Sequence, residues 1–366
     1  MSFITCGFVG LGLIGGSIAR ALKENIPNSR IVATDINEAA LSLAKRESVA
    51  DITTDSVDNS FCDCDYIFLC APVNKNDENL SAVKKVMNPH CLLTDVGSVK
   101  TGIHETVREA GLEHCFIGGH PMAGSERVGF LNSKAALLEN AYYILTPTAQ
   151  VPNEKLEAYR QLVTGMRAIP LVLDYLKHDY ITAAISHLPH VIAASLVNLV
   201  RESDSKDGVM KMIAAGGFKD ITRIASSQAG MWQQICLTNG ANISSLLCDY
   251  IDSLTAFREL LDGHDAKALY EQFENARIYR DSFINTSSGP LKRSYRISVE
   301  IADKSGALAN ITALLAQREI SIKNIGITHN REGDDGVLKL EFYEENAMIL
   351  AAHILREQGY CVDIRS

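Results

Sequence analysis

The stretch Phe8-Val9-Gly10-Leu11-Gly12-Leu13-Ile14-Gly15-Gly16-Ser17 decides the fold of the N-terminal part of this chain. It follows a short apolar segment, opens a helical pattern and has the G-x-G-x-x-G spacing typical of a strand-turn-helix that holds a dinucleotide. Gly10 permits the tight turn, Gly12 lets the backbone approach a pyrophosphate, and Gly15 lets the helix lie close to the strand. The helix N-terminus then offers unpaired N–H groups to the phosphates. The predicted cofactor contacts here are Gly10, Gly12, Leu13, Ile14 and Gly15.

The next predicted strand, Ile31–Asp35, ends in a carboxylate twenty residues after Gly15. An acid at this spacing binds the ribose hydroxyls of NAD and repels the additional phosphate of NADP. Asp35 therefore predicts NAD as the cofactor. The alternative is an ordinary glycine-rich connection between a strand and a helix.

The composition indicates a soluble globular protein with two or three domains. Of its 366 residues, 22% are charged and 46% hydrophobic, and the net charge of −9 argues against nucleic acid as a partner, because phosphate binding needs a basic face. No apolar run reaches the roughly 18 residues of a membrane span, and no basic-then-apolar leader follows Met1. Nine cysteines without a C-x-x-C pattern favour reduced thiols in a cytoplasmic protein and no metal site.

Residues 1–172 are predicted to form a Rossmann-type NAD-binding domain with a parallel sheet, because apolar strands alternate with helical stretches. Ligands bind outside the carboxyl ends of such strands, so Pro72 and Ser98, which follow two of them, join the predicted cofactor contacts. The expected strands are Thr5–Val9, Ile31–Asp35, Tyr66–Cys70, Cys91–Asp95, Cys115–Gly118 and Ala141–Leu145.

Residues 173–288 are predicted to form an all-helical domain for substrate binding and dimerisation, because strand signals vanish there. Apolar residues follow helical spacing, and Pro189 is expected in an early turn or at a kink. Large apolar helices of this kind often form a dimer core, and 286–290 reads as a linker. The expected helices are Ile181–Val200, Val209–Ala215, Met231–Leu261 and Lys267–Phe283.

Residues 294–366 form a third predicted unit. An alternating strand from Ile297 to Ile301 precedes a helix, Ala307–Gln317. Two strands that flank a polar loop, a helix and a last strand complete a βαββαβ order, which is ferredoxin-like. These elements are Ile320–Ile327, Val337–Phe342, Asn346–Gln358 and Tyr360–Ile364.

Two polar clusters follow predicted strands of the first domain. In Asp95–Lys100, the Ser98 hydroxyl and the Lys100 ammonium can reach a nicotinamide, although Ser98 is equally explained as a helix cap. In Gly118–Glu126, His120 is placed as a general base, because its ordinary pKa near 6.5 suits proton removal at neutral pH. Taken alone, a histidine is more often a structural residue.

A third cluster lies in the helical domain, in Ser186–His190 and Gly216–Arg223. The planar guanidinium of Arg223 can grip a carboxylate, and Asp220, one helical turn earlier, can orient it. The alternative is a surface ion pair between these two side chains.

Together these clusters closely resemble the prephenate dehydrogenase family of tyrosine biosynthesis, which includes arogenate and mixed-specificity cyclohexadienyl dehydrogenases. Five matching segments run in family order over about Met1–Phe283, which is far more specific than any one of them. They are Gly7–Ser17, Asp95–Lys100, Gly118–Glu126, Ser186–His190 and Gly216–Trp232.

The resemblance implies a role for each matching residue. His120 matches the histidine that accepts the proton of the ring hydroxyl, and Ser98 the serine that contacts both that histidine and the nicotinamide. Arg223 matches the arginine that binds a substrate carboxylate. The other implied substrate-side residues are Glu126, Ser186, His187, His190, Asp220 and Trp232. Lys219 stands where many members carry arginine, which keeps the positive charge.

The activity that the resemblance implies is NAD-dependent oxidative decarboxylation of prephenate to 4-hydroxyphenylpyruvate, an oxidoreductase reaction that needs no metal. Hydride leaves C4 for NAD, His120 takes the hydroxyl proton, and loss of CO2 makes the ring aromatic. The sequence leaves open whether arogenate is the preferred substrate. A non-catalytic, dinucleotide-sensing regulator is the alternative of another class, and the presence of His120, Ser98 and Arg223 argues against it. No chorismate mutase segment precedes the glycine loop, so a fused bifunctional enzyme is not expected.

The third unit resembles an ACT domain, a module that commonly binds amino acids. The match covers the strand-to-helix turn Asp303–Leu308, where Ser305 replaces a frequent proline, and Asn324-Ile325 on the next strand. The resemblance implies feedback inhibition by L-tyrosine in a homodimer, with a purely structural pairing module as the alternative. The implied ligand contacts are Ser305, Gly306, Ala307, Leu308, Asn324 and Ile325.

Overall fold

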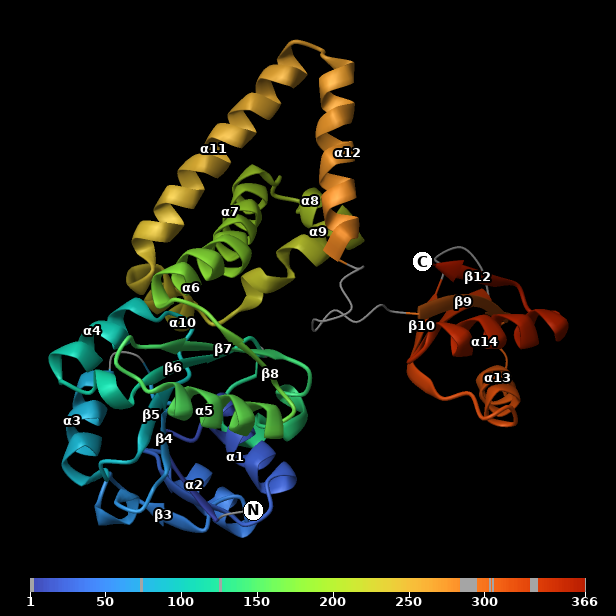
Figure 1. Ribbon diagram of the computed structural model, residues 1–366. Coiled ribbons are helices and arrows are strands. Elements are labelled where there is room, and N and C mark those ends of the chain that lie inside the picture. Colours follow the sequence, from blue (N-terminus) through green and yellow to red (C-terminus); the bar gives the residue numbers. More distant parts are fainter. Residues whose placement is uncertain are drawn as a thin grey trace. The chain divides into compact units, whose positions relative to one another are not determined.

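The computed structural model describes residues 3–72, 75–124, 127–283, 295–302, 304, 306–329 and 335–365. The chain forms two compact units, Met1–Leu269 and Tyr270–Ser366, and Figure 1 shows their elements. Four of the sequence predictions fall outside the described residues: Glu126, Ser305, the linker 286–290 and most of the polar loop at 331–334.

The first unit begins with a five-stranded parallel sheet whose order is β3-β2-β1-β4-β5. The chain fills one side of β1 first and then crosses to the other side, so the strand order reverses between β1 and β4. A cofactor crevice is expected at that point, beyond the carboxyl ends of the strands. The strands are β1 (Ile4–Val9), β2 (Ser29–Thr34), β3 (Ile52–Thr54), β4 (Tyr66–Leu69) and β5 (Leu92–Asp95). The helices are α1 (Leu13–Asn25), α2 (Glu38–Arg46), α3 (Asn76–Val86) and α4 (Thr101–Glu109).

Both faces of this sheet are covered, so its strands are apolar on both sides. Phe8 and Phe68 stack at 4.9 Å between ring centroids in a core shared with α1, α2 and the later helix α5 (Asn153–Gly165). Their neighbours Val9 and Leu69 point into a second core, shared with α3 and α4. Alternation along each strand therefore fixes which helices lie on which face (Figure 1).

A second group of strands extends the fold: β6 (Ile117–Pro121), β7 (Tyr142–Pro147) and β8 (Ile169–Val172). β6 joins the edge of β5 through a parallel bridge between Leu93 and Phe116. β6 and β7 are antiparallel, whereas β7 and β8 are parallel. The sheet is therefore mixed beyond β6, and the sequence prediction of parallel strands throughout does not hold there. Short, polar β3 and the proline-containing β8 were not predicted.

The helical part of the first unit begins with a continuous helical run. It comprises α6 (Tyr175–Thr182), a π-helical turn (Ala183–His187) and α7 (Leu188–Ser203). Pro189 lies in the first turn of α7, where its missing N–H costs little, and the wide π turn directly precedes it. The expectation of an early turn or a kink at Pro189 is thus met by a π turn.

Three short helices and one long helix follow, and a 3-10 turn, Arg223–Ser226, connects the second of them to the third. They are α8 (Val209–Ile213), α9 (Gly216–Thr222), α10 (Ala229–Thr238) and α11 (Gly240–Asp262), after which α12 (Ala266–Ser282) leads into the second unit. The predicted single helix Met231–Leu261 is wrong, because it breaks at Asn239. The buried Asn239 side chain donates to the carbonyl oxygen of Asp179 (2.8 Å) and lies 3.1 Å from Nδ1 of His187.

Among the described residues, one helical run, Tyr175–Ser203, is long and apolar enough to cross a membrane, with a mean hydropathy of 1.5. Length and composition alone are weak evidence, because core helices of globular proteins pass the same test. Only 17% of the apolar window of this run is buried. The buried polar side chains of His178 and Asp179 near its start bond to protein groups.

The second unit contains a four-stranded antiparallel sheet with the order β10-β11-β9-β12. Its elements are β9 (Tyr295–Ala302), α13 (Ala307–Ala316), β10 (Ile322–His329), β11 (Asp335–Phe342), α14 (Glu345–Glu357) and β12 (Val362–Arg365). Apolar residues of the sheet and of both helices form one core. The predicted βαββαβ order is confirmed, and with it the fold class of the whole chain.

Candidate functional site

The glycine loop after β1 has the shape that a dinucleotide needs. Gly10 has φ +97°, and a Cβ there would lie 2.7 Å from the backbone N of Ala71. A Cβ on Gly15 would lie 2.7 Å from the carbonyl oxygen of Gly10, whereas a Cβ on Gly12 would meet no atom within 4 Å. Gly10 and Gly15 therefore close the turn, and the space at Gly12 stays open at the start of α1, whose first residues are Leu13 and Ile14.

Asp35 lies directly after β2 and is bonded to the glycine loop. One carboxylate oxygen accepts from the backbone N–H of Leu11 at 2.5 Å, and the other from that of Asn37 at 2.7 Å. Pro72 follows β4 and is exposed, and its carbonyl accepts from the N–H of Lys75 at 2.9 Å. The ends of β1, β2 and β4 thus meet at one edge of the sheet, and the residues there fit a dinucleotide with a free ribose diol.

His120 lies on β6, and two glycines before it let β6 approach its neighbours closely. A Cβ on Gly118 would lie 2.3 Å from the Thr146 hydroxyl, and one on Gly119 would lie 2.6 Å from the carbonyl oxygen of Asp95. Any larger side chain at either position would push β6 away from β5 or β7. His120 is therefore held beside the loop that follows β5.

That loop, Asp95–Lys100, is fixed to β6 by a fully buried ion pair. The Lys100 ammonium donates to the Asp95 carboxylate and to the carbonyl oxygen of Gly119 (2.8 Å for the latter). Asp95 also accepts from the N–H groups of Gly97 (2.9 Å) and Gly119 (3.2 Å). Ser98 is half-buried in the same loop, so a predicted cofactor contact lies in the loop that is hydrogen-bonded to Gly119, the residue before the predicted base.

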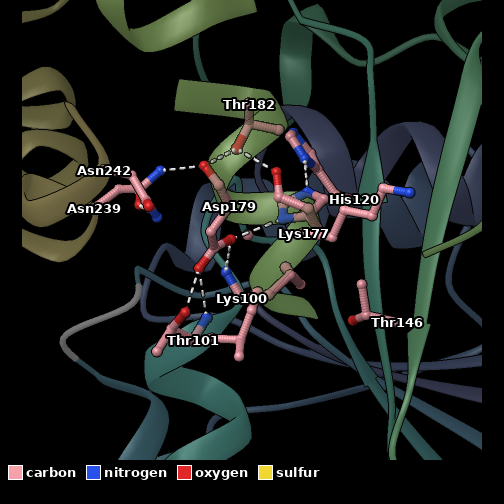
Figure 2. Close-up of polar contacts among 12 residues, drawn as sticks. Lys100, Thr101, His120, Thr146, Lys177, Asp179, Thr182, Asn239 and Asn242 are labelled. Atoms are coloured by element: carbon pink, nitrogen blue, oxygen red, sulfur yellow. Dashed lines mark hydrogen bonds and ion pairs between the residues drawn. The ribbon is translucent and has the colours of Figure 1, made fainter. Parts of the chain in front are cut away.

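A chain of hydrogen bonds continues from His120 into the helical part. Its Nδ1 lies 2.8 Å from Nε2 of His178, and Nδ1 of His178 lies 2.8 Å from the carboxylate of Asp179. That carboxylate also accepts from the N–H of Lys100 (2.8 Å), and from the N–H (2.8 Å) and hydroxyl (2.6 Å) of Thr101. Figure 2 shows Asp179 between Lys100 and Thr101 on one side and Asn239 on the other.

Sequence reasoning did not single out His178 or Asp179. Both side chains are essentially buried at the start of the apolar helical run. The sequence signal for them was a His-Asp pair at the start of an otherwise apolar helix. Such groups are seldom buried unless they are paired, so the pair could have been proposed as part of a buried polar site.

Burial is the main cause that lowers the pKa of His120 well below 6.5, and repulsion by His178, Lys100 and His187 lowers it further. The imidazole is therefore neutral at neutral pH. A neutral imidazole on the cofactor side of the sheet can accept a proton, which is what a general base must do.

Predicted substrate-side residues gather around one aromatic side chain. His190 stacks on Trp232 with ring centroids 3.5 Å apart, and His187 meets the same ring edge-on at 5.9 Å. His190 Nδ1 lies 2.9 Å from the carbonyl oxygen of Ser186. Burial lowers the pKa of His187 to about 4. The structure thus brings Ser186, His187, His190 and Trp232 together.

Arg223 opens the 3-10 turn after α9 and is exposed. Its charge reaches His190: burial lowers the pKa of His190, a hydrogen bond to the Ser186 carbonyl opposes this, and repulsion by Arg223 adds to the lowering. Arg223 is therefore on the Trp232 side of the site. Asp220 is exposed on α9, one turn earlier.

The predicted regulatory residues lie in the second unit. Gly306 caps α13 with φ +90°, a conformation that favours glycine, and Ala307 and Leu308 begin that helix. Asn324 and Ile325 are exposed on β10, where the Asn324 side chain accepts from the N–H of Ile325 at 2.9 Å.

Two family models match the chain. The one described as "Prephenate dehydrogenase, nucleotide-binding domain" covers residues 18–170, and "Prephenate dehydrogenase, dimerization domain" covers 175–275. The chain is 36% identical over 339 residues to a prephenate dehydrogenase of Bacillus subtilis, covering 92% of this chain and 91% of the relative. It is 30% identical to a cyclohexadienyl dehydrogenase of Zymomonas mobilis, covering 74% of this chain and 93% of the relative.

A solved structure shares the fold. The prephenate dehydrogenase of Aquifex aeolicus, in complex with hydroxyphenyl propionate and NAD+, is similar with a TM-score of 0.73 and 30% identity. The similarity covers 77% of this chain and 99% of that chain.

Proposed function

This chain belongs to the prephenate dehydrogenase family, and on that premise we propose that it oxidises prephenate to 4-hydroxyphenylpyruvate and CO2 with NAD, a step of L-tyrosine biosynthesis. The observation that carries the proposal is His120, a neutral imidazole on β6. The residue before it, Gly119, accepts from the Lys100 ammonium of the loop that follows β5. His120 supplies a proton acceptor where a coenzyme in the Gly10–Gly15 loop would present its nicotinamide.

We assign the roles of the site residues from the family resemblance, and their places in the fold support these roles. When bound, NAD supplies the acceptor for the hydride that leaves C4 of the ring. His120 accepts the proton of the ring hydroxyl, and Ser98, in the loop after β5, contacts both His120 and the nicotinamide. Arg223 binds a carboxylate of the substrate, beside the wall formed by Trp232. We assign the remaining substrate side to Glu126, Ser186, His187, His190 and Asp220.

Absorbance of NADH after addition of prephenate and NAD tests this function. Wild-type protein is expected to form NADH, and His120→Asn to bind NAD normally while its turnover falls about 10²–10⁴-fold. Near-normal turnover in that variant would remove His120 from the mechanism, and no NADH from the wild type would contradict the function itself.

Arogenate or mixed specificity is the second candidate, and the cyclohexadienyl dehydrogenase among the relatives favours testing it. Arogenate carries an amino group in place of the side-chain keto group. Steady-state kcat/KM values for both substrates decide between the two. A non-catalytic, dinucleotide-sensing regulator would need no proton acceptor at this position, so the neutral His120 speaks against it.

We further propose that the protein is a cytoplasmic homodimer. Large apolar side chains of the helical part are exposed in the single chain, among them Leu199, Leu237 and Ile251. A second copy would cover them, and they lie within the match to a dimerization domain. Nine free thiols fit a reducing compartment. Sedimentation equilibrium of the full chain is expected to give twice its 40.0 kDa.

The second unit is proposed to bind L-tyrosine and to mediate feedback inhibition. Support comes from its βαββαβ order and the left-handed Gly306 before α13. Titration calorimetry of the full chain with tyrosine is expected to give heat, and tyrosine is expected to slow NADH formation. No heat at millimolar tyrosine would leave a purely structural pairing module.

A further inference from the structure

Asp179 and His178 form a buried hydrogen-bond chain that ends on the proposed base. Asp179 is on α6, His178 precedes it, and His120 comes from β6, 58 positions earlier than His178. The two links, His120 Nδ1 to His178 Nε2 and His178 Nδ1 to Asp179 Oδ1, are both 2.8 Å long. Each of these two hydrogen bonds needs one proton on the donor and a lone pair on the acceptor, so the proton position in one bond determines that in the other.

Asp179 determines the donor in its bond with His178, because an ionised carboxylate can only accept hydrogen bonds. Burial alone would raise its pKa, but hydrogen bonds from His178, Thr101 and Lys100 outweigh burial and lower it. The carboxylate is ionised, and backbone N–H groups and a hydroxyl already point at it. Nδ1 of His178 must then carry the proton in their shared bond.

The proton arrangement of the two histidines follows. In the neutral form of His178 the one ring proton is on Nδ1, so Nε2 accepts. His120 must then donate through its own Nδ1, and its Nε2 is left with a free lone pair. A general base needs such a free lone pair, and in His120 it lies on Nε2, the nitrogen that is not bonded to His178.

We propose that His178 and Asp179 are positioning residues that hold His120 in the Nδ1–H tautomer and present its unprotonated Nε2 to the substrate hydroxyl. The inference rests on the proposed function for the identity of the substrate. The tautomer itself can be measured without any substrate.

Asp179 also links this arrangement to the cofactor side. Its bonds to the N–H groups of Lys100 and Thr101 hold the first turn of α4, directly after the loop that carries Ser98. The same carboxylate thus orients the base through His178 and fixes the loop proposed to contact the nicotinamide. A purely structural role would use only the second set of bonds.

Among the residues that the structure describes, the other charged groups near His120 do not impose a competing tautomer. Lys100 and His187 are the further groups that influence it electrostatically. The Lys100 ammonium is occupied by Asp95 and the carbonyl of Gly119, and His187 Nδ1 pairs with Asn239. His178 Nε2 is therefore the acceptor for the N–H of His120 Nδ1.

The first test is the tautomer, measured by ¹⁵N NMR of full-length, histidine-labelled protein, with the His120 signals assigned by their loss in His120→Asn. The wild type is expected to show a protonated Nδ1 and an unprotonated Nε2. In Asp179→Asn, an amide N–H turned toward His178 reverses both histidines, so the proton is expected on Nε2 of His120. A proton on Nε2 of wild-type His120 would overturn the proposal.

The second test is kinetic. Asp179→Asn is expected to lower kcat about 10²–10⁴-fold with little change in KM, because a wrong tautomer removes the base while the substrate anchor remains. His178→Gln keeps an acceptor for His120 and should retain most activity, whereas His178→Phe should lose it. These two variants keep the proposal testable if Asp179→Asn fails to fold.

Thr101→Val is the matched control. It removes a hydrogen bond to the same carboxylate but leaves the link to His178, so kcat should stay within a few-fold of wild type. An equal loss in Thr101→Val and Asp179→Asn, or equal activity of His178→Phe and His178→Gln, would mean that the chain is only structural. If prephenate and arogenate are both inert but the NMR tautomer is as expected, the proposed function fails and the positioning role stands.

Discussion

His120 owes its neutral state to its surroundings, since burial and three cationic or titratable neighbours all lower its pKa. The identity of the residue suggested a base from the sequence, and the structure adds why it is unprotonated at neutral pH. The pairing of His120 with His178 could not be predicted, because a bond between β6 and α6 depends on the packing of segments far apart in the chain.

At this same scale, Arg223→Ala is expected to raise KM for prephenate with a smaller effect on kcat. Loss of a charge-assisted bond to a carboxylate costs about 1.5–3 kcal/mol, which corresponds to about 10- to 100-fold in kcat/KM. Arg201→Ala, which removes an exposed arginine on α7, is the control. An unchanged KM in Arg223→Ala would place the carboxylate site elsewhere.

Asp35→Asn is expected to relax the preference for NAD over NADP. The amide oxygen can still accept from the N–H of Leu11, so the loop keeps its shape while the negative charge is lost. The ratio of kcat/KM for the two cofactors should fall by at least about tenfold, or about 1.4 kcal/mol. Unaltered selectivity, as expected for the exposed Asp55→Asn, would overturn the assignment of Asp35.

At the scale of elements, two glycines in the turn from β1 into α1 have different requirements: Gly15 is needed for packing, whereas Gly12 leaves space for the ligand. Gly15→Ala would put a methyl group 2.7 Å from the Gly10 carbonyl, so the backbone must shift, at a cost of about 1–3 kcal/mol in stability. Gly12→Ala meets nothing within 4 Å and has φ −80°, which alanine tolerates.

The Gly15→Ala and Gly12→Ala variants should therefore differ in melting temperature but both lose NAD affinity. Gly15→Ala is expected to lower both the melting temperature and NAD affinity. Gly12→Ala should keep the melting temperature and lose NAD affinity, because its methyl group fills the approach of the pyrophosphate. Calorimetric NAD titration and thermal melts of both variants check this, and full NAD affinity in Gly12→Ala would contradict the phosphate site.

Elements with a strong local pattern were predictable, and those set by tertiary contacts were not. The glycine loop, six of the first-unit strands and the βαββαβ order follow from periodicity and turn residues. The antiparallel pairing of β6 with β7 was missed because apolar runs carry no direction. The break at Asn239 was missed because its side chain bonds to groups that are distant in sequence.

At the scale of the whole molecule, buried neutral histidines make stability depend on pH. Burial, the largest cause in each case, lowers the pKa of His104 and of His187 to about 4 from the usual 6.5. Between about pH 6.5 and 4 the unfolded chain thus binds more protons than the folded one. Stability is fully present above pH 6.5 and declines as the pH falls through this window.

The expected outcome is a melting temperature that drops steadily from pH 6.5 toward pH 4. His104→Gln keeps a polar contact for Thr146 and removes one of these groups, so its melting temperature should depend less steeply on pH. The exposed His90→Gln should leave the slope unchanged. Identical slopes in His104→Gln and wild type, measured by scanning calorimetry, would refute this account.

The paired glycines at 118 and 119 limit how this enzyme could be remodelled. Because a methyl group at either place would collide with a neighbouring strand, directed evolution toward new substrates would find no tolerated diversity at those two codons. Libraries would do better to vary the half-buried or exposed residues around Trp232 and Arg223. The positions that tolerate substitution therefore lie in the helical part, whereas those that hold the proposed base lie on β6.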